Sequence, residues 1–310
     1  MTYSIVARDP ETGDMGVAVQ SHYFSVGPVV PWALAGVGVV ATQAMAEVSY
    51  GPLGLELMRG GKPAPAALRA LLEADDGRAV RQVAMLDAAG GVAAHTGERC
   101  IPHAGHRSGD GVSVQANMME RDTVPDAMLA AFSSATGSLA ERLVDALDAA
   151  EAEGGDIRGR QSAAILVVGG DRSSPWWAQR RVDLRVEDHP QPLAELRRLL
   201  RLRQAYDAQS RAFELMRSDP AAAAALMREA LDRAPESDEL AFWAALGLAA
   251  SDLAEARRLL GFASDREPRW AELLRRLPAT GTFPLTDEAV DALLSSDRRG
   301  GGVRDRREVD

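Results

Sequence analysis

The sequence has little cysteine, little lysine and no excess of positive charge. Of its 310 residues one is cysteine, Cys100, which excludes an intrachain disulfide and an iron–sulfur cluster held by four cysteines. One residue is lysine, Lys62, so 34 of the 35 basic residues are arginine, and lysine-dependent chemistry has a single candidate. The net charge of −10 is the opposite of the basic footprint that nucleic-acid binding requires. We therefore expect no nucleic-acid partner.

Signals for export or membrane insertion are also missing from the pattern. The chain begins with charges at Arg8 and Asp9, where a secretory signal would continue as an apolar run. Residues 20–46 carry no charged side chain, but Pro28 and Pro31 would break a helix, and the many valines favour buried strands. We expect a cytoplasmic protein without a membrane partner.

The first 190 residues alternate between strand and helix patterns. Residues 2–8 and 15–21 both alternate in polarity and flank a turn-rich segment at 9–14, which predicts a hairpin with Thr2 opposite Ser21. Further strands are predicted at 82–88, 92–95, 112–117, 162–168 and 181–186. Helices are predicted from Tyr50, from Pro63, and at 126–133 and 139–152. This order favours a layered α+β domain with helices outside mixed sheets.

After about residue 188 the pattern becomes helical throughout. Pro235 and Pro268 are 33 residues apart (268 − 235), close to the tetratricopeptide period of ~34, and Trp243 begins a matching W-x-x-L-G run. We count at most two imperfect helical hairpins. The predicted domains are 1–203 (layered), 204–296 (small, all-α, tetratricopeptide-like) and 297–310 (a disordered tail).

Thr2 is the residue on which the functional interpretation depends. Removal of Met1, which is usual before a small residue, leaves a hydroxyl and a free α-amine on Thr2. An α-amine with a pKa of about 7.7–8.0 can act as a general base near neutral pH, so such a threonine can be nucleophile and base together. An inert strand start is the alternative interpretation of the same residue.

Several ordered motifs resemble a bacterial family of unknown function, DUF1028. They are Thr2-Tyr3-Ser4-Ile5-Val6-Ala7-Arg8-Asp9, Gly16-Val17-Ala18-Val19, Val29-Val30-Pro31-Trp32-Ala33, Gly36-Val37-Gly38, Ala41-Thr42-Gln43, Tyr50-Gly51-Pro52 with Gly54-Leu55, Ala94-His95-Thr96-Gly97, Gly105-His106-Arg107, Gln115-Ala116-Asn117 and Gly159-Arg160-Gln161-Ser162-Ala163. That family is grouped with the N-terminal-nucleophile (Ntn) hydrolases. The resemblance implies a four-layer αββα sandwich and amide-bond hydrolysis.

The resemblance also implies roles for individual residues. Thr2 matches the superfamily's nucleophile, but the aspartate and strand lysine of proteasome-like members have no counterpart here, since Lys62 lies at a helix start. The neutral residues Ser4, Ser21, Asn117 and Ser162 are then the candidate partners of Thr2. Asn117 could donate to an oxyanion, with a structural asparagine at a turn or strand end as the alternative. Arg160 is expected to hold a substrate carboxylate, with a surface ion pair as the alternative.

A histidine-rich segment is the second candidate site. His95, Cys100, His103 and His106 have zinc-ligand chemistry, but their spacing matches no standard zinc module. We expect no metal and no cofactor, and we assign His95 and His106 to the wall of the Thr2 pocket.

Two functional hypotheses follow. The first is an amide hydrolase with Thr2, Ser21, Asn117 and Ser162 as catalytic residues and a small-molecule or peptide amide as substrate. The second is a non-catalytic ligand- or cell-wall-fragment-binding scaffold that keeps the Ntn fold. The helical part resembles a small family proposed to bind peptidoglycan, in which Trp243 and Trp270 would stack on sugars, although core packing is the alternative. We also expect a homo-oligomer.

Overall fold

The computed structural model describes residues 2–281 and 285–295, which fall into two compact units, one ending at Leu200 and the other beginning at Arg201. Helix α5 (Pro192–Leu215) contains this boundary, so the chain passes from one unit to the other without a loop. The tail predicted at residues 297–310 lies outside the described residues. In the part of the chain that is described, no helix combines the length and the apolar character needed to cross a membrane.

The strands of the first unit form two antiparallel sheets. The six-stranded sheet has the order β10-β9-β2-β1-β8-β7, and the four-stranded sheet has the order β3-β4-β5-β6. The bounds are β1 (Thr2–Arg8), β2 (Met15–Ser21), β3 (Pro31–Leu34), β4 (Gly38–Ala44), β5 (Arg81–Asp87), β6 (Val92–Thr96), β7 (Gly105–Gly109), β8 (Val112–Asn117), β9 (Ser162–Val168) and β10 (Arg180–Val186). The predicted combination of helices and strands is confirmed, but the sheets, which were expected to be mixed, are both antiparallel.

The predicted N-terminal hairpin is confirmed in its register, with Thr2 opposite Ser21 and Arg8 opposite Met15. Strand β7 was not predicted. Its sequence, Gly105-His106-Arg107-Ser108-Gly109, is polar and lies half-buried or exposed at a sheet edge, so it lacks the apolar alternation by which strands are recognised.

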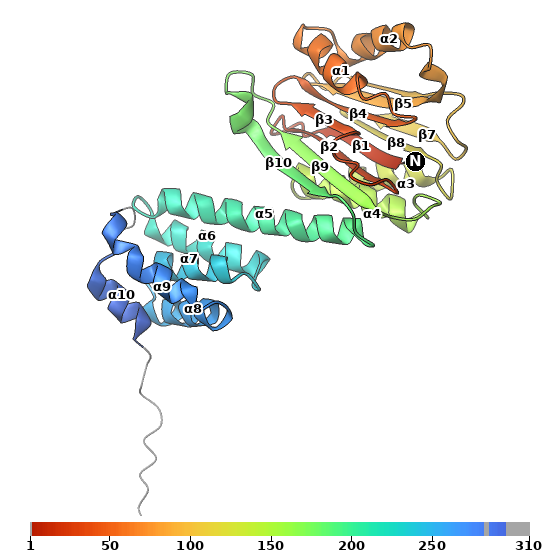
Figure 1. Cartoon of the computed structure of the whole chain (residues 1–310). Coiled ribbons are helices and arrows are strands. Elements are labelled where there is room, and N and C mark those ends of the chain that lie inside the picture. Colours follow the sequence, from red (N-terminus) through yellow and green to blue (C-terminus); the bar gives the residue numbers. More distant parts are fainter. Residues whose placement is uncertain (1, 282–284, 296–310) are drawn as a thin grey trace, which may run out of the picture. The chain divides into compact units, whose positions relative to one another are not determined.

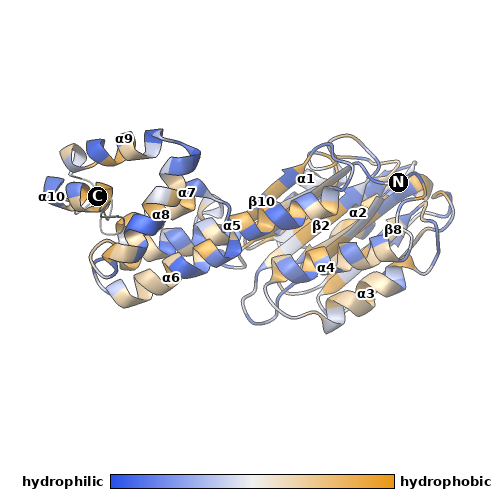
Figure 2. Ribbon diagram, turned by 90° about the horizontal axis from the view of Figure 1, so that it is seen from below, coloured by the Kyte–Doolittle hydropathy of each residue, from blue (hydrophilic) through white to orange (hydrophobic). Residues whose placement is uncertain are grey.

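Three apolar layers hold the first unit together. Valines 6, 17 and 39 belong to the cluster between the two sheets. Helices α3 (Val124–Ser134) and α4 (Leu139–Ala152) cover the outer face of the six-stranded sheet, with the start of α5. Helices α1 (Tyr50–Arg59) and α2 (Ala64–Ala74) cover the four-stranded sheet on the opposite side (Figure 1). Helix α4 alternates in polarity along its length (Figure 2), as expected for a helix with one face on a sheet.

The second unit is helical. After the C-terminal part of α5 it contains α6 (Pro220–Arg233), α7 (Asp238–Leu248), α8 (Leu253–Arg266), α9 (Arg269–Arg276) and α10 (Asp287–Leu294). Phe242 is fully buried, stacks on Trp270 at 4.8 Å between ring centroids, and meets the Trp243 ring edge-on at 5.0 Å. The Trp270 indole donates a hydrogen bond to Asp238. Both tryptophans are therefore partly buried and pack against the core of this unit.

A close approach between α1 and β3 requires glycine at one position. A Cβ on Gly51 would lie 2.3 Å from Cγ of the Trp32 ring, whereas a Cβ on Gly54, one turn later, would meet the terminal methyl of Met85 at 2.7 Å. The indole is rigid and its Nε1 is bonded to the carbonyl of Val29, while the methionine side chain can rotate away.

We therefore expect Gly51→Ala to lower the free energy of unfolding by about 1–3 kcal/mol relative to Gly54→Ala, because overpacking against a fixed ring costs that much. Both changes replace a glycine of the same helix by alanine, so the second variant is a matched control. Urea unfolding followed by circular dichroism measures the difference. Equal stability of the two variants would contradict the close packing of α1 on Trp32.

Candidate active site

The four predicted catalytic residues form one row across the six-stranded sheet. Thr2 begins β1 and pairs with Ser21 at the end of β2 and with Asn117 at the end of β8, while Ser21 pairs with Ser162 at the start of β9. Residues directly opposite one another share a face of the sheet. All four are buried, and Thr2 is 4% exposed.

The hydroxyl of Thr2 lies 3.0 Å from the hydroxyl of Ser21. The carbonyl of Thr2 accepts hydrogen bonds from two amide side chains, Gln43 on β4 and Asn117 on β8, each at 3.3 Å. The side chains that hold Thr2 are therefore uncharged, and one of them comes from the other sheet.

Gln82 on β5 fixes the two amides that hold Thr2. Its Oε1 accepts hydrogen bonds from Gln43 at 2.7 Å and from Asn117 at 2.9 Å. Its Nε2 donates to the carbonyls of Ala116 and Gly105 and to the hydroxyl of Thr96. Gln82 is fully buried, so these bonds replace those that its amide would make with water.

Ser4 and Gln115 extend this arrangement along the sheet. The Ser4 hydroxyl donates to Oε1 of Gln43, and Nε2 of Gln115 donates to the Ser4 hydroxyl, each at 2.6 Å. We call Gln43, Gln82, Gln115 and Asn117 the amide network. It joins the two sheets at the end where Thr2 lies.

A cavity of about 410 Å³ opens at Thr2. Its lining residues are Thr2, Ser21, Tyr23, Val26, Val29, Val30, Gln43, Ala44, Met45, Ala46, Val48 and Arg81. The volume lies in the range of small-molecule sites. Of the predicted catalytic residues, Thr2 and Ser21 line this space, whereas Asn117 and Ser162 are not among its lining residues.

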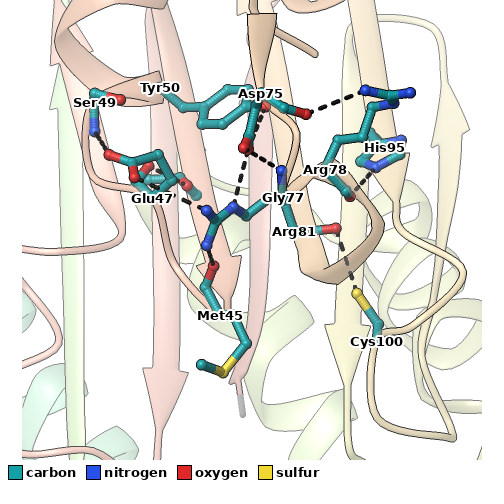
Figure 3. Close-up of polar contacts among 11 residues, drawn as sticks. Met45, Glu47, Ser49, Tyr50, Asp75, Gly77, Arg78, Arg81, His95 and Cys100 are labelled. Atoms are coloured by element: carbon teal, nitrogen blue, oxygen red, sulfur yellow. Dashed lines mark hydrogen bonds and ion pairs between the residues drawn. The ribbon is translucent and has the colours of Figure 1, made fainter. Parts of the chain in front are cut away.

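Arg81 is the one charged residue among those described as lining the cavity, and its charge is already paired. Its Nε donates to Asp75 at 3.0 Å, one terminal nitrogen donates to the carbonyl of Met45 at 2.6 Å, and the other lies 4.0 Å from Glu47 (Figure 3). The hydrogen bond from Arg81 lowers the pKa of the Asp75 carboxyl. Arg81 thus anchors the wall segment at Met45.

Ser162 bonds to backbone groups of a segment that lines the cavity. Its hydroxyl donates to the carbonyl of Tyr23 at 2.6 Å and accepts from the backbone N–H of Val26 at 3.1 Å. Tyr23 and Val26 line the cavity, so Ser162 holds the opposite wall in place.

The histidines contact backbone and hydroxyl groups outside the cavity. His106 lies 2.9 Å from the hydroxyl of Thr96 and reaches Thr2 only through Thr96 and the amide network. His95, which lies on β6 of the four-stranded sheet, bonds to the carbonyl of Arg78 (Figure 3). His103 bonds to the carbonyls of Met119 and Glu120. Within residues 2–281 and 285–295, no three His, Cys, Asp or Glu side chains converge as metal ligands.

Arg160 also lies outside the cavity lining. It forms an ion pair with Glu151 on α4, and the same carboxylate accepts a hydrogen bond from the Tyr3 hydroxyl at 2.6 Å. Tyr3 is on the face of β1 opposite to Thr2. Arg160 is thus found in an ion pair, the alternative to holding a substrate carboxylate.

Sequence reasoning missed Gln43 and Gln82 as site residues. The available signal was a glutamine near the end of a valine-rich strand and another at the start of the next strand, both at positions where an apolar side chain would be expected. Arg81, next to Gln82, carried no distinguishing pattern.

Residues 2–196 match the model of a family of unknown function, DUF1028. Among solved structures, the chain is similar to the crystal structure of protein SPO2555 from Silicibacter pomeroyi, which carries the same family label. The identity is 34%, the TM-score is 0.58, and the match covers 64% of this chain and 87% of that one. Among curated proteins, none matched.

His106 makes stability depend on pH. Burial, followed by the charges of His95 and Arg107, lowers the pKa of His106 below its ordinary value. The unfolded chain therefore binds a proton at His106 more readily than the folded protein does. The contribution of neutral His106 to the free energy of unfolding is fully present above its pKa in the unfolded chain, about 6.5, and is lost as pH falls toward its pKa in the folded protein.

We expect His106→Asn, which keeps an acceptor for Thr96 but does not titrate, to show a shallower loss of unfolding free energy than the parent between about pH 7.5 and about pH 5.5. Chemical unfolding at each pH measures this slope. His189→Asn controls for the loss of an exposed histidine. Parallel slopes for parent and His106→Asn would refute the coupling.

Proposed function

The chain belongs to the DUF1028 family, and we propose that it is an amide-bond hydrolase of the Ntn type in which Thr2, after removal of Met1, is the nucleophile. The observation that carries this proposal is the placement of Thr2, which lines a cavity while its carbonyl is held by two amides and its hydroxyl lies beside that of Ser21. Two facing sheets with helices on both outer faces support the proposed αββα sandwich.

In the proposed reaction the α-amine of Thr2 takes the proton of its own hydroxyl, directly or through a water. Oγ1 then attacks the carbonyl carbon of the bound amide. The tetrahedral intermediate breaks its C–N bond, the α-ammonium protonates the leaving amine, and an ester on Thr2 remains. Water, deprotonated by the same amine, hydrolyses this ester and releases the acid.

The side chains around Thr2 favour its own amine as the base. Ser21, Gln43 and Asn117 hold Thr2 without titrating, so they orient it but take no proton near neutral pH. Ser21 is positioned to fix the direction of the Thr2 hydroxyl, 3.0 Å away.

We reassign Asn117 from oxyanion donor to positioning residue. Its side-chain nitrogen already donates to the carbonyl of Thr2 and to Gln82, and Asn117 is 2% exposed. The oxyanion role passes in this proposal to the backbone N–H of Ala46, because the N–H of Met45 already donates to the carbonyl of Val80. Ala46 lines the cavity and follows a sharp turn at Ala44, where φ is 69°.

A β-lactone probe tests the nucleophile. We expect intact mass to show loss of Met1, and peptide mass spectrometry to locate one adduct on Thr2. Thr2→Ser should keep labelling and Thr2→Ala should abolish it, while Thr123→Ala, which removes an exposed hydroxyl bonded to Glu153, should not change it. The labelling rate should rise through about pH 7.7–8.0 as the amine loses its proton.

Two results would contradict the proposal. Retained Met1 in the native protein removes the base, and unchanged labelling of Thr2→Ala shows that another residue reacts. If neither result is found, hydrolysis of amides by the parent but not by Thr2→Ala would establish that Thr2 catalyses the reaction.

The second candidate function is ligand binding without catalysis. The specific observation in its favour is that the charged residue of the described cavity lining, Arg81, is paired with Asp75 and stabilises a wall. Under this hypothesis amides bind in the cavity, Thr2 takes up no probe, and Thr2→Ala still binds the amides.

A further inference from the structure

Most of the cavity wall is apolar. Seven of its twelve lining residues have aliphatic or thioether side chains: Val26, Val29, Val30, Ala44, Met45, Ala46 and Val48. The other five are Thr2, Ser21, Tyr23, Gln43 and Arg81, and of these Thr2, Ser21 and Gln43 lie together at the end of the sheets. One side of the cavity is therefore suited to an amide, and the rest to a group that makes no hydrogen bonds.

The apolar surface continues over the rim. Tyr23, Phe24 and Met45 are 53%, 64% and 63% exposed, and Val48 is 40% exposed. They come from the two segments that flank the cavity, 22–30 and 44–49, which Ser162 and Arg81 hold in place. An exposed apolar surface that joins a cavity is typical of a binding site.

The electrostatics of the cavity disfavour a charged ligand. A carboxylate would find Arg81 already bonded to Asp75 and to the carbonyl of Met45. An ammonium group would meet the positive charge of Arg81, and no carboxylate is among the described lining residues. Burying a charge without a partner is costly, whereas burying a methylene is favourable.

We infer that the cavity takes an uncharged amide bearing an aliphatic chain, which lies along the valine wall and extends toward the rim. The amide part rests on the proposed function. The preference for an apolar chain concerns binding and holds with or without hydrolysis.

NMR titration of primary amides tests this preference. We expect the Kd to fall about fourfold per methylene from butanamide to hexanamide, as expected for burying methylenes. We expect 4-methylpentanamide to bind at least about tenfold more tightly than succinamate, which has nearly the same shape but ends in a carboxylate. Similar affinity for this pair, no dependence on chain length, or no binding of hexanamide would overturn the inference.

Two valine variants show whether the cavity wall is responsible. Val29 and Val92 are both partly buried against the same apolar cluster, but Val29 lines the cavity and Val92 does not. We expect Val29→Thr to weaken hexanamide binding about threefold to tenfold and Val92→Thr to leave it unchanged. Equal effects would show that the chain does not lie along this wall.

Failure of the proposed function gives a different pattern. If Thr2 takes up no β-lactone and no ammonia is released, while chain-length dependence persists in both the parent and Thr2→Ala, the chemistry is wrong and the ligand class stands. If Thr2 reacts but charged and apolar amides bind alike, the chemistry stands and the ligand class is wrong.

Discussion

The candidate site depends on the hydrogen bonds that two buried amide side chains donate to the carbonyl of Thr2. Gln43 and Gln82 belong to one sheet, while Thr2 and Asn117 belong to the other, so these hydrogen bonds also fix how the two sheets meet at this end. An unpaired amide buried there would cost about 1–3 kcal/mol, which makes the fully bonded arrangement strongly preferred over partly bonded ones. Packing of the valines between the sheets supplies apolar stabilisation but little directional preference. The amide network supplies the direction.

The scarcity of lysine has a structural counterpart in this network. Lys62 lies in the connection between α1 and α2, outside the residues that line the cavity. The positions around Thr2 are filled by glutamine, asparagine and serine, which hold a residue in place without placing a charge beside it. The charge at the cavity therefore comes from Arg81 among the described lining residues, and Arg81 is bonded to Asp75 and to the carbonyl of Met45.

The parts of the fold that follow from local chemistry were predictable from the sequence. The turn residues at 9–14 and the alternation on both sides fixed the pairing of Thr2 with Ser21, and Asn117 was found through a family resemblance. Gln43 and Gln82 were not predicted, because which faces of two sheets meet depends on contacts between distant residues, such as Ser4 with Gln43, 39 positions apart, and Gln82 with Asn117, 35 positions apart. The roles expected of Ser162, His95, His106 and Arg160 depended on where side chains point. Each of these side chains bonds to a neighbour that no local pattern identifies: Tyr23, Arg78, Thr96 and Glu151.

Strand β1 uses both of its faces within its first two residues. Thr2 points to the cavity, and Tyr3 points to the opposite side, where its hydroxyl bonds to Glu151. A shift of one residue in the strand would turn it over, placing the phenol in the cavity and the threonine against α4. In genetic terms, inserting or deleting one codon between Thr2 and Arg8 would invert the faces of the residues before the change, whereas a change in the length of the turn at 9–14 lies outside the paired residues of β1.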